Sequence, residues 1–212
     1  FLHASGLRRG DRVLIMLPRI PEWWYMMLGL IRLGAVPVPG TLLLTARDVA
    51  YRLAAADIRA IITNQEGISK VADFDGLRFL VDGDSPGWLD LARGVRDASP
   101  EFAAPRTFHD DPGILYFTSA TTGEPKMVLH TQASYGLAHR ATAEYWLDLK
   151  PDDVHWNLSD LGWAKAAWSS FYGPWHMGAC VFAMDSTGKF EPTAALDVLA
   201  RFPITTWCVP PT

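Results

Sequence analysis

The stretch ILYFTSATTGEPKMVLH, residues 114–130, decides how the rest of the chain is interpreted. An apolar run at 114–117 stops at hydroxyl residues, and a second apolar run follows Lys126. This order predicts a strand, a polar loop and another strand. Hydroxyl donors, a glycine that lets the backbone come close and one lysine are the groups with which a loop binds a polyphosphate.

Two other interpretations of this loop have to be weighed. A Walker A loop is excluded, because the spacing G-x-x-x-x-G-K-[ST] is absent and the residues after Lys126 favour a strand over a helix. An ordinary hairpin turn at 118–125 fits the composition equally well, since Ser, Thr, Gly and Pro are common turn residues. Composition alone leaves the turn and the phosphate loop open.

Around this loop, strand and helix patterns alternate along the chain. We predict strands at 13–17, 36–38, 60–63, 78–81, 154–158, 179–184 and 205–209, and helices at 22–33, 46–56, 88–95, 133–146, 162–176 and 192–201. Thr45 and Asp48 have the spacing of a capping box, and a break in the helix at 162–176 is expected near Pro174. Strands separated by helices predict an α/β fold with mostly parallel sheets covered by helices.

The order of residues in the loop separates the two open interpretations. Residues 118–126 resemble the phosphate-binding signature T-S-G-T-T-G-x-P-K of AMP-forming adenylating enzymes, which include acyl-CoA synthetases, peptide-synthetase adenylation domains and firefly luciferase. Only Ala120 departs from the signature, at a position where the family has glycine. The resemblance implies that nine residues bind the phosphates of ATP: Thr118, Ser119, Ala120, Thr121, Thr122, Gly123, Glu124, Pro125 and Lys126.

The resemblance extends over the whole chain and is greatest to the medium-chain acyl-CoA synthetases. The further matching segments are 10–13, 17–24, 32–36, 158–163, 173–175 and 207–212. The resemblance implies an α/β fold with two similar βαβ pieces, as in the large N-terminal domain of that family. It also implies approximate pieces at 1–110 and 111–212, the second containing the phosphate loop.

The resemblance implies a reaction and roles for particular residues. The family activates a carboxylic acid with ATP and Mg²⁺, releases pyrophosphate, and transfers the acyl group to coenzyme A. Lys126 would stabilise the departing pyrophosphate, and Gly162 and Trp163 would lie at the pocket for the acid, with core packing the alternative for Trp163. Trp168 and Trp175 are expected in the core, and His130 is expected to be structural.

Segments that the family needs for catalysis are not found in these residues. The glutamate-bearing segment for adenine and Mg²⁺ and the C-terminal domain with its lysine would follow Thr212, so we expect a partial N-terminal domain that holds no metal and is inactive by itself. An aryl-CoA ligase, a peptide-synthetase adenylation domain and a non-catalytic nucleotide-binding remnant are the alternatives. In the phosphate loop, Ala120 is expected to be a handicap if its φ is positive.

Composition and charge limit the classes of molecule that the chain is expected to bind. A net charge of −4 with dispersed acidic and basic residues argues against binding to nucleic acid, and the longest apolar run, 23–31, is too short to cross a membrane. Cys180 and Cys208 show no metal-ligand spacing and suit a reducing cytoplasm. The expected partners are therefore a small carboxylic acid, ATP and coenzyme A, with self-association left open.

Overall fold

A computed structural model describes residues 1–71, 73–118, 123–185 and 190–209. In chain order the elements are β1 (Arg12–Met16), α1 (Pro21–Leu33), β2 (Val36–Pro39), α2 (Ala46–Ala55), β3 (Ile58–Thr63), α3 (Gln65–Ile68), β4 (Leu77–Leu80), β5 (Leu89–Asp90), α4 (Leu91–Asp97), β6 (Pro112–Thr118), β7 (Lys126–Thr131), η1 (Gln132–Leu137), α5 (His139–Tyr145), β8 (Val154–Asn157), α6 (Ala164–Ala167), η2 (Trp168–Tyr172), α7 (Gly173–His176), β9 (Cys180–Phe182), α8 (Pro192–Arg201) and β10 (Thr206–Cys208). The labels η1 and η2 denote π-helical turns.

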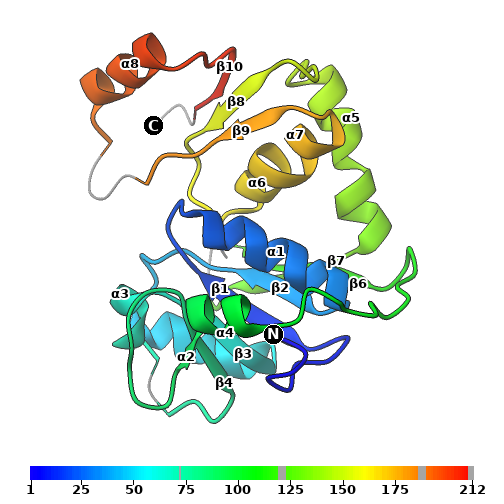
Figure 1. The fold of residues 1–212 in the computed structure, drawn as a ribbon, viewed down its shortest axis with the longest axis vertical. Helices are drawn as coiled ribbons and strands as arrows, with labels where there is room; N and C mark the ends of the chain where they lie inside the picture. The colour runs from blue at the N-terminus through cyan, green and yellow to red at the C-terminus, as the bar shows by residue number, and fades with distance from the viewer. Residues whose placement is uncertain (72, 119–122, 186–189, 210–212) are drawn as a thin grey trace.

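The strands form two parallel sheets and one antiparallel hairpin (Figure 1). The larger sheet has the order β2-β1-β3-β4-β5, and the smaller has the order β10-β8-β9. All strand pairs within these two sheets are parallel, whereas β6 pairs with β7 in the antiparallel direction. The predicted α/β fold with mostly parallel sheets and covering helices is confirmed.

Helix α1 is buried on two sides. Figure 1 shows it between the larger sheet and the segment of α6 and α7. This position explains why its sequence is apolar around most of its circumference, with Trp23, Met27 and Leu30 fully buried. Pro21 lies in its first turn, and Gly34 ends it at φ 74°, as the sequence predicts.

The apolar core joins distant parts of the chain. Trp23 of α1 contacts Phe171 of η2 edge to face, with ring centroids 6.1 Å apart. Buried residues from both sides of residue 110 belong to this one cluster. The division into pieces at 1–110 and 111–212 therefore stays a prediction. Within the described ranges, every helix is too short or too polar to cross a membrane.

Three predicted helices differ from the structure. The helix expected at 88–95 is α4, which begins at Leu91 because the Asp90 side chain accepts a hydrogen bond from the Arg93 N–H (2.9 Å). The helix expected at 133–146 begins with η1, where Thr131 and Ser134 form a capping box, and continues as α5. Between 162 and 176 the irregularity is η2 and not Pro174, which lies in the first turn of α7, where a proline is tolerated.

A hydrogen bond from α1 compensates for the donor that Pro174 lacks. A residue with an N–H at position 174 could donate to the carbonyl of Ser170 one turn earlier, but proline has none. The indole Nε1–H of Trp24 donates to that carbonyl instead (2.8 Å). The Ser170 hydroxyl accepts from the Asn157 side-chain amide (2.8 Å), so Ser170 connects α1, η2 and β8.

We therefore predict that Trp24→Phe lowers the free energy of unfolding by about 1–2 kcal/mol beyond its loss of packing, because the Ser170 carbonyl loses a buried donor. Urea denaturation of the single and double variants with Pro174→Ala measures this. The cost should shrink by about 1 kcal/mol in the Pro174→Ala background, where a new N–H is present.

Trp23→Phe is the control for packing, because the Trp23 indole N–H has no hydrogen-bond partner among the described residues. Its cost should be the same whether position 174 holds the native proline or carries the Pro174→Ala substitution. Equal coupling of both tryptophans to position 174 would contradict the role given to Trp24.

Candidate functional site

The β6–β7 hairpin carries the sequence that resembles a phosphate loop. Thr118 ends β6 opposite Lys126, which begins β7, and the Thr118 hydroxyl donates to the Lys126 carbonyl (3.4 Å). The two strands of the predicted strand–loop–strand arrangement are therefore present and paired. The site residues Ser119, Ala120, Thr121 and Thr122 lie outside the described residues.

The described side of the loop is exposed to solvent. Gly123 has φ 104°, in the left-handed region, and a Cβ built on it would meet nothing within 4 Å. Lys126 is exposed at the start of β7. Glu124 is 4.0 Å from the Arg47 guanidinium, an exposed ion pair that contributes little to stability. Gly123 thus has a backbone conformation that favours glycine, and the side chains of Glu124 and Lys126 are exposed.

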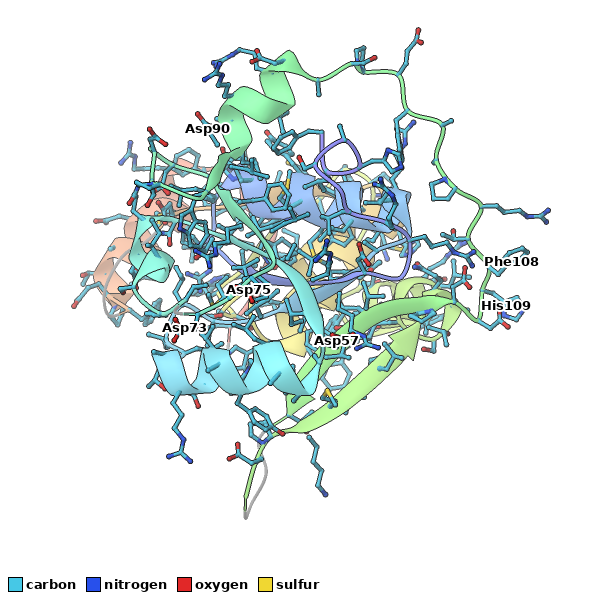
Figure 2. The ribbon with its side chains drawn as sticks, turned by 90° about the horizontal axis from the view of Figure 1, so that it is seen from below. Asp57, Asp73, Asp75, Asp90, Phe108 and His109 are labelled. Atoms are coloured by element: carbon cyan, nitrogen blue, oxygen red, sulfur yellow. The ribbon has the colours of Figure 1, made fainter. Side chains whose placement is uncertain are left out.

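Helix α2 supports this hairpin at its loop end. The Tyr51 hydroxyl donates to the Pro125 carbonyl (3.0 Å), and Figure 2 shows α2 beside the hairpin. The Phe117 ring lies edge to face with Tyr51 (6.0 Å) and under the Arg52 guanidinium (5.0 Å). Sequence analysis missed the contacts of Tyr51 and Arg52, which lie next to each other on α2 and whose segment carries a capping box but no binding motif.

A second candidate loop follows β8 and spans residues 158–163, the β8 loop. Asp160 accepts a hydrogen bond from the Gly162 N–H (2.7 Å), and its carbonyl accepts from the Trp163 N–H (3.1 Å). Trp163 is 63% exposed, which argues against the core interpretation of this side chain. Whether Gly162 and Trp163 contact an acid stays a prediction.

The β8 loop packs against the ends of β1 and β2. A Cβ on Gly162 would stand 2.1 Å from the Thr41 nitrogen, so only glycine fits there. The Thr41 hydroxyl donates to the Asp160 carboxylate (2.9 Å), and the Arg19 guanidinium donates to the Leu158 carbonyl. Burial lowers the pKa of Arg19 below its ordinary value, and the nearby Asp160 and Asp185 carboxylates act in the opposite direction with a smaller effect. Three strands therefore meet at their carboxyl ends, the edge at which parallel sheets bind ligands.

The other aromatic and histidine residues follow their predictions in part. Trp168 is half-buried, packs on the core and stacks on His139 (5.6 Å), whereas Trp175 is 41% exposed, so its predicted core position is wrong. Trp175 lies in the last turn of α7, which ends at the exposed residue His176. His130 packs against Tyr135 (4.9 Å), which supports a structural role.

Tyr135 also contacts His139, with ring centroids 4.3 Å apart. Burial, and to a smaller degree His130 and His176, lowers the pKa of His139 to about 4. His139 is therefore neutral at pH 7, and it serves as a ring that packs between Tyr135 and Trp168.

The described residues hold no cluster of metal-binding side chains. They bring no three His, Cys, Asp or Glu side chains together in a way that could hold a metal ion. Among the described residues next to the loop, Thr118 offers a hydroxyl and Glu124 an exposed carboxylate, which by themselves do not form a set of ligands for Mg²⁺. No step is therefore assigned to a metal held by these residues.

Comparison with known proteins gives the family directly. A family model described as "AMP-binding enzyme" matches residues 1–212. Human mitochondrial acyl-coenzyme A synthetase ACSM3 is 42% identical over 99% of the chain, and human mitochondrial ACSM4 is 44% identical over 98%. In both comparisons the chain spans 37% of the length of the relative.

Solved structures agree with the observed fold. The chain is similar to an acyl-CoA synthetase of Brucella canis, with a TM-score of 0.89 and 27% identity over 99% of this chain and 39% of that one. The anthranilate CoA ligase AuaEII, solved with anthranoyl-AMP, has a TM-score of 0.87 at 24% identity over 96% of this chain and 40% of that one. The second likeness shows the fold alone.

The support of the hairpin by α2 generates a prediction. Tyr51→Phe should increase hydrogen–deuterium exchange in residues 123–131 by about fivefold, since the lost hydrogen bond is worth about 1 kcal/mol. Tyr25→Phe, at an exposed position of α1, is the matched control and should leave exchange in the hairpin unchanged. Equal exchange in both variants would show that the Tyr51 hydroxyl does not hold the hairpin.

Proposed function

We propose a function on the premise that this chain belongs to the AMP-binding enzyme family. The protein that contains it activates a carboxylic acid with ATP to an acyl-adenylate and pyrophosphate. It then transfers the acyl group to coenzyme A and releases AMP. The observation that supports the proposal is the β6–β7 hairpin, whose strands flank the matching sequence and whose Pro125 carbonyl accepts a hydrogen bond from Tyr51 of α2.

In this reaction the protein mainly positions the carboxylate and ATP and stabilises the charge that develops on pyrophosphate. One carboxylate oxygen attacks the α-phosphorus, and the bond from that phosphorus to the bridging oxygen of pyrophosphate breaks. Negative charge accumulates on the leaving pyrophosphate, so hydroxyl and amide donors at 118–125 and the Lys126 ammonium favour its departure. Exposure of Lys126 and Gly123 in the described structure leaves room for a phosphate chain to approach.

The acid would lie at the β8 loop. We assign Gly162 and Trp163 to its pocket, because they stand at the carboxyl ends of β8, β1 and β2 and because Trp163 is exposed. A medium-chain acid is the preferred substrate class, on the resemblance of 158–163 and 173–175 to that branch. Mg²⁺ would neutralise phosphate charge when bound.

The cytoplasmic location expected from the cysteines stays a prediction. The similar human proteins named above are mitochondrial. Cell fractionation with compartment markers separates the two locations.

The full-length protein should exchange labelled pyrophosphate into ATP only when a suitable acid is present. Straight-chain acids of short and medium length and benzoates form the test panel. Lys126→Ala should lower kcat/KM for ATP by roughly tenfold to a hundredfold, through loss of a charge-assisted contact to phosphate. Lys150→Ala, at another exposed lysine, should leave it unchanged.

A folded protein that exchanges with no acid on the panel would contradict the proposed activity. A polypeptide of the 212 residues alone, expected to be inactive because it spans 37% of its relatives, serves as the negative control.

Ala120 gives a separate prediction about the phosphate loop. If the family's glycine is needed for a positive φ, a Cβ costs roughly 1 kcal/mol, and contact with a phosphate adds to that. Ala120→Gly in the full-length protein should then raise kcat/KM for ATP several-fold. Unchanged kinetics would show that Ala120 has an ordinary negative φ with its methyl group pointing away from the phosphates.

A further inference from the structure

Thr41 connects two segments that are far apart in the sequence. It follows β2 after Gly40, and its hydroxyl donates to Oδ2 of Asp160, 119 positions later (2.9 Å). The same hydroxyl oxygen accepts a hydrogen bond from the Leu43 N–H (3.1 Å). The orientation of the hydroxyl is therefore fixed from both sides, by its own loop and by the β8 loop.

Asp160 uses its other oxygen within the β8 loop. Its Oδ1 accepts from the Gly162 N–H (2.7 Å), a short distance typical of a charged acceptor. Its carbonyl oxygen accepts from the Trp163 N–H (3.1 Å). The Asp160 carboxylate thus joins Thr41 to the Gly162 amide, and the Asp160 backbone carbonyl holds the Trp163 amide beside it.

The contact between the two segments leaves little freedom of position. The Gly162 backbone lies so close to Gly40 and Thr41 that a Cβ would stand 2.4 Å from the Gly40 carbonyl carbon. On the other side, the Arg19 guanidinium donates to the Leu158 carbonyl and carries the charge opposite to that of Asp160. Packing sets the distance of the β8 loop from β2, and the Thr41–Asp160 hydrogen bond sets its direction.

We propose that Thr41 is a positioning residue for the acid substrate: through Asp160 it holds Gly162 and Trp163 in the orientation that binds the carboxylic acid. The inference rests on the proposed function, because it requires Gly162 and Trp163 to contact the acid. Thr41 itself need not touch the acid. Its effect passes through one carboxylate to the amide of the pocket residue.

The test compares three variants of the full-length protein. Thr41→Val keeps the shape but removes the hydroxyl, Thr41→Ser keeps the hydroxyl, and Thr45→Val removes a hydroxyl that also donates to an aspartate, Asp48 (2.7 Å), in the helix cap of α2. Thr41→Val should raise KM for the acid roughly tenfold with KM for ATP unchanged. Thr41→Ser should restore the wild-type KM, and Thr45→Val should change stability but not KM for the acid.

Hydrogen–deuterium exchange gives a readout independent of turnover. Exchange in residues 158–163 should rise in Thr41→Val and stay at the wild-type rate in Thr41→Ser and Thr45→Val. An active wild type with an unchanged acid KM in Thr41→Val would overturn this inference and leave the proposed function intact. A folded wild type that activates no acid would overturn the proposed function and the inference together.

Discussion

The arrangement of the molecule depends on the contact between the backbone of Gly162 and the backbone of Gly40 and Thr41. No side chain fits between these segments, so the β8 loop lies directly on the end of β2. This contact aligns the carboxyl ends of strands from two different sheets. Because the side chains that follow parallel strands gather at that edge, a site there can draw on both sheets.

Polar contacts fix the orientation of α1 relative to η2 and β8, which apolar packing alone does not determine. The apolar core of Trp23 and Phe171 holds α1 against η2, but an apolar contact tolerates sliding. The Trp24 indole, which donates to the Ser170 carbonyl, and Asn157, which donates to the Ser170 hydroxyl, each allow one geometry. A few buried hydrogen bonds thereby fix the position of the second sheet relative to α1, which packs on the first sheet.

Local signals in the sequence predicted much of the fold. Pro21 and Gly34 mark the ends of α1, and Thr45 with Asp48 marks the start of α2, because capping depends on residues within one turn. The π-helical turns were not predictable, since their sequence period does not differ enough from that of an α-helix. Exposed Trp175 was placed in the core because aromatic content says nothing about which face is covered.

The candidate site was predictable only where it forms a continuous motif. Residues 118–126 are assigned from their order and Gly162 from its neighbours in the matching segment, and both assignments stay predictions. Tyr51 and Thr41 could not be assigned in this way, because each acts on a residue more than seventy positions away and neither belongs to a pattern. Contacts of this kind depend on how β2 and α2 pack, which a single sequence does not reveal.

The segment from Thr41 to Tyr51 touches both loops, and this restricts how the chain can change in length. Thr41 lies in the turn before α2, where its carbonyl accepts from the Leu44 N–H (3.3 Å), and Tyr51 lies within α2, so the turn and the helix together set their separation. One residue inserted after Thr45 would turn Tyr51 by about 100° around the helix axis, away from Pro125, while Thr41 stayed in place. Insertions and deletions should therefore be excluded from this stretch among functional relatives, even where its individual side chains vary.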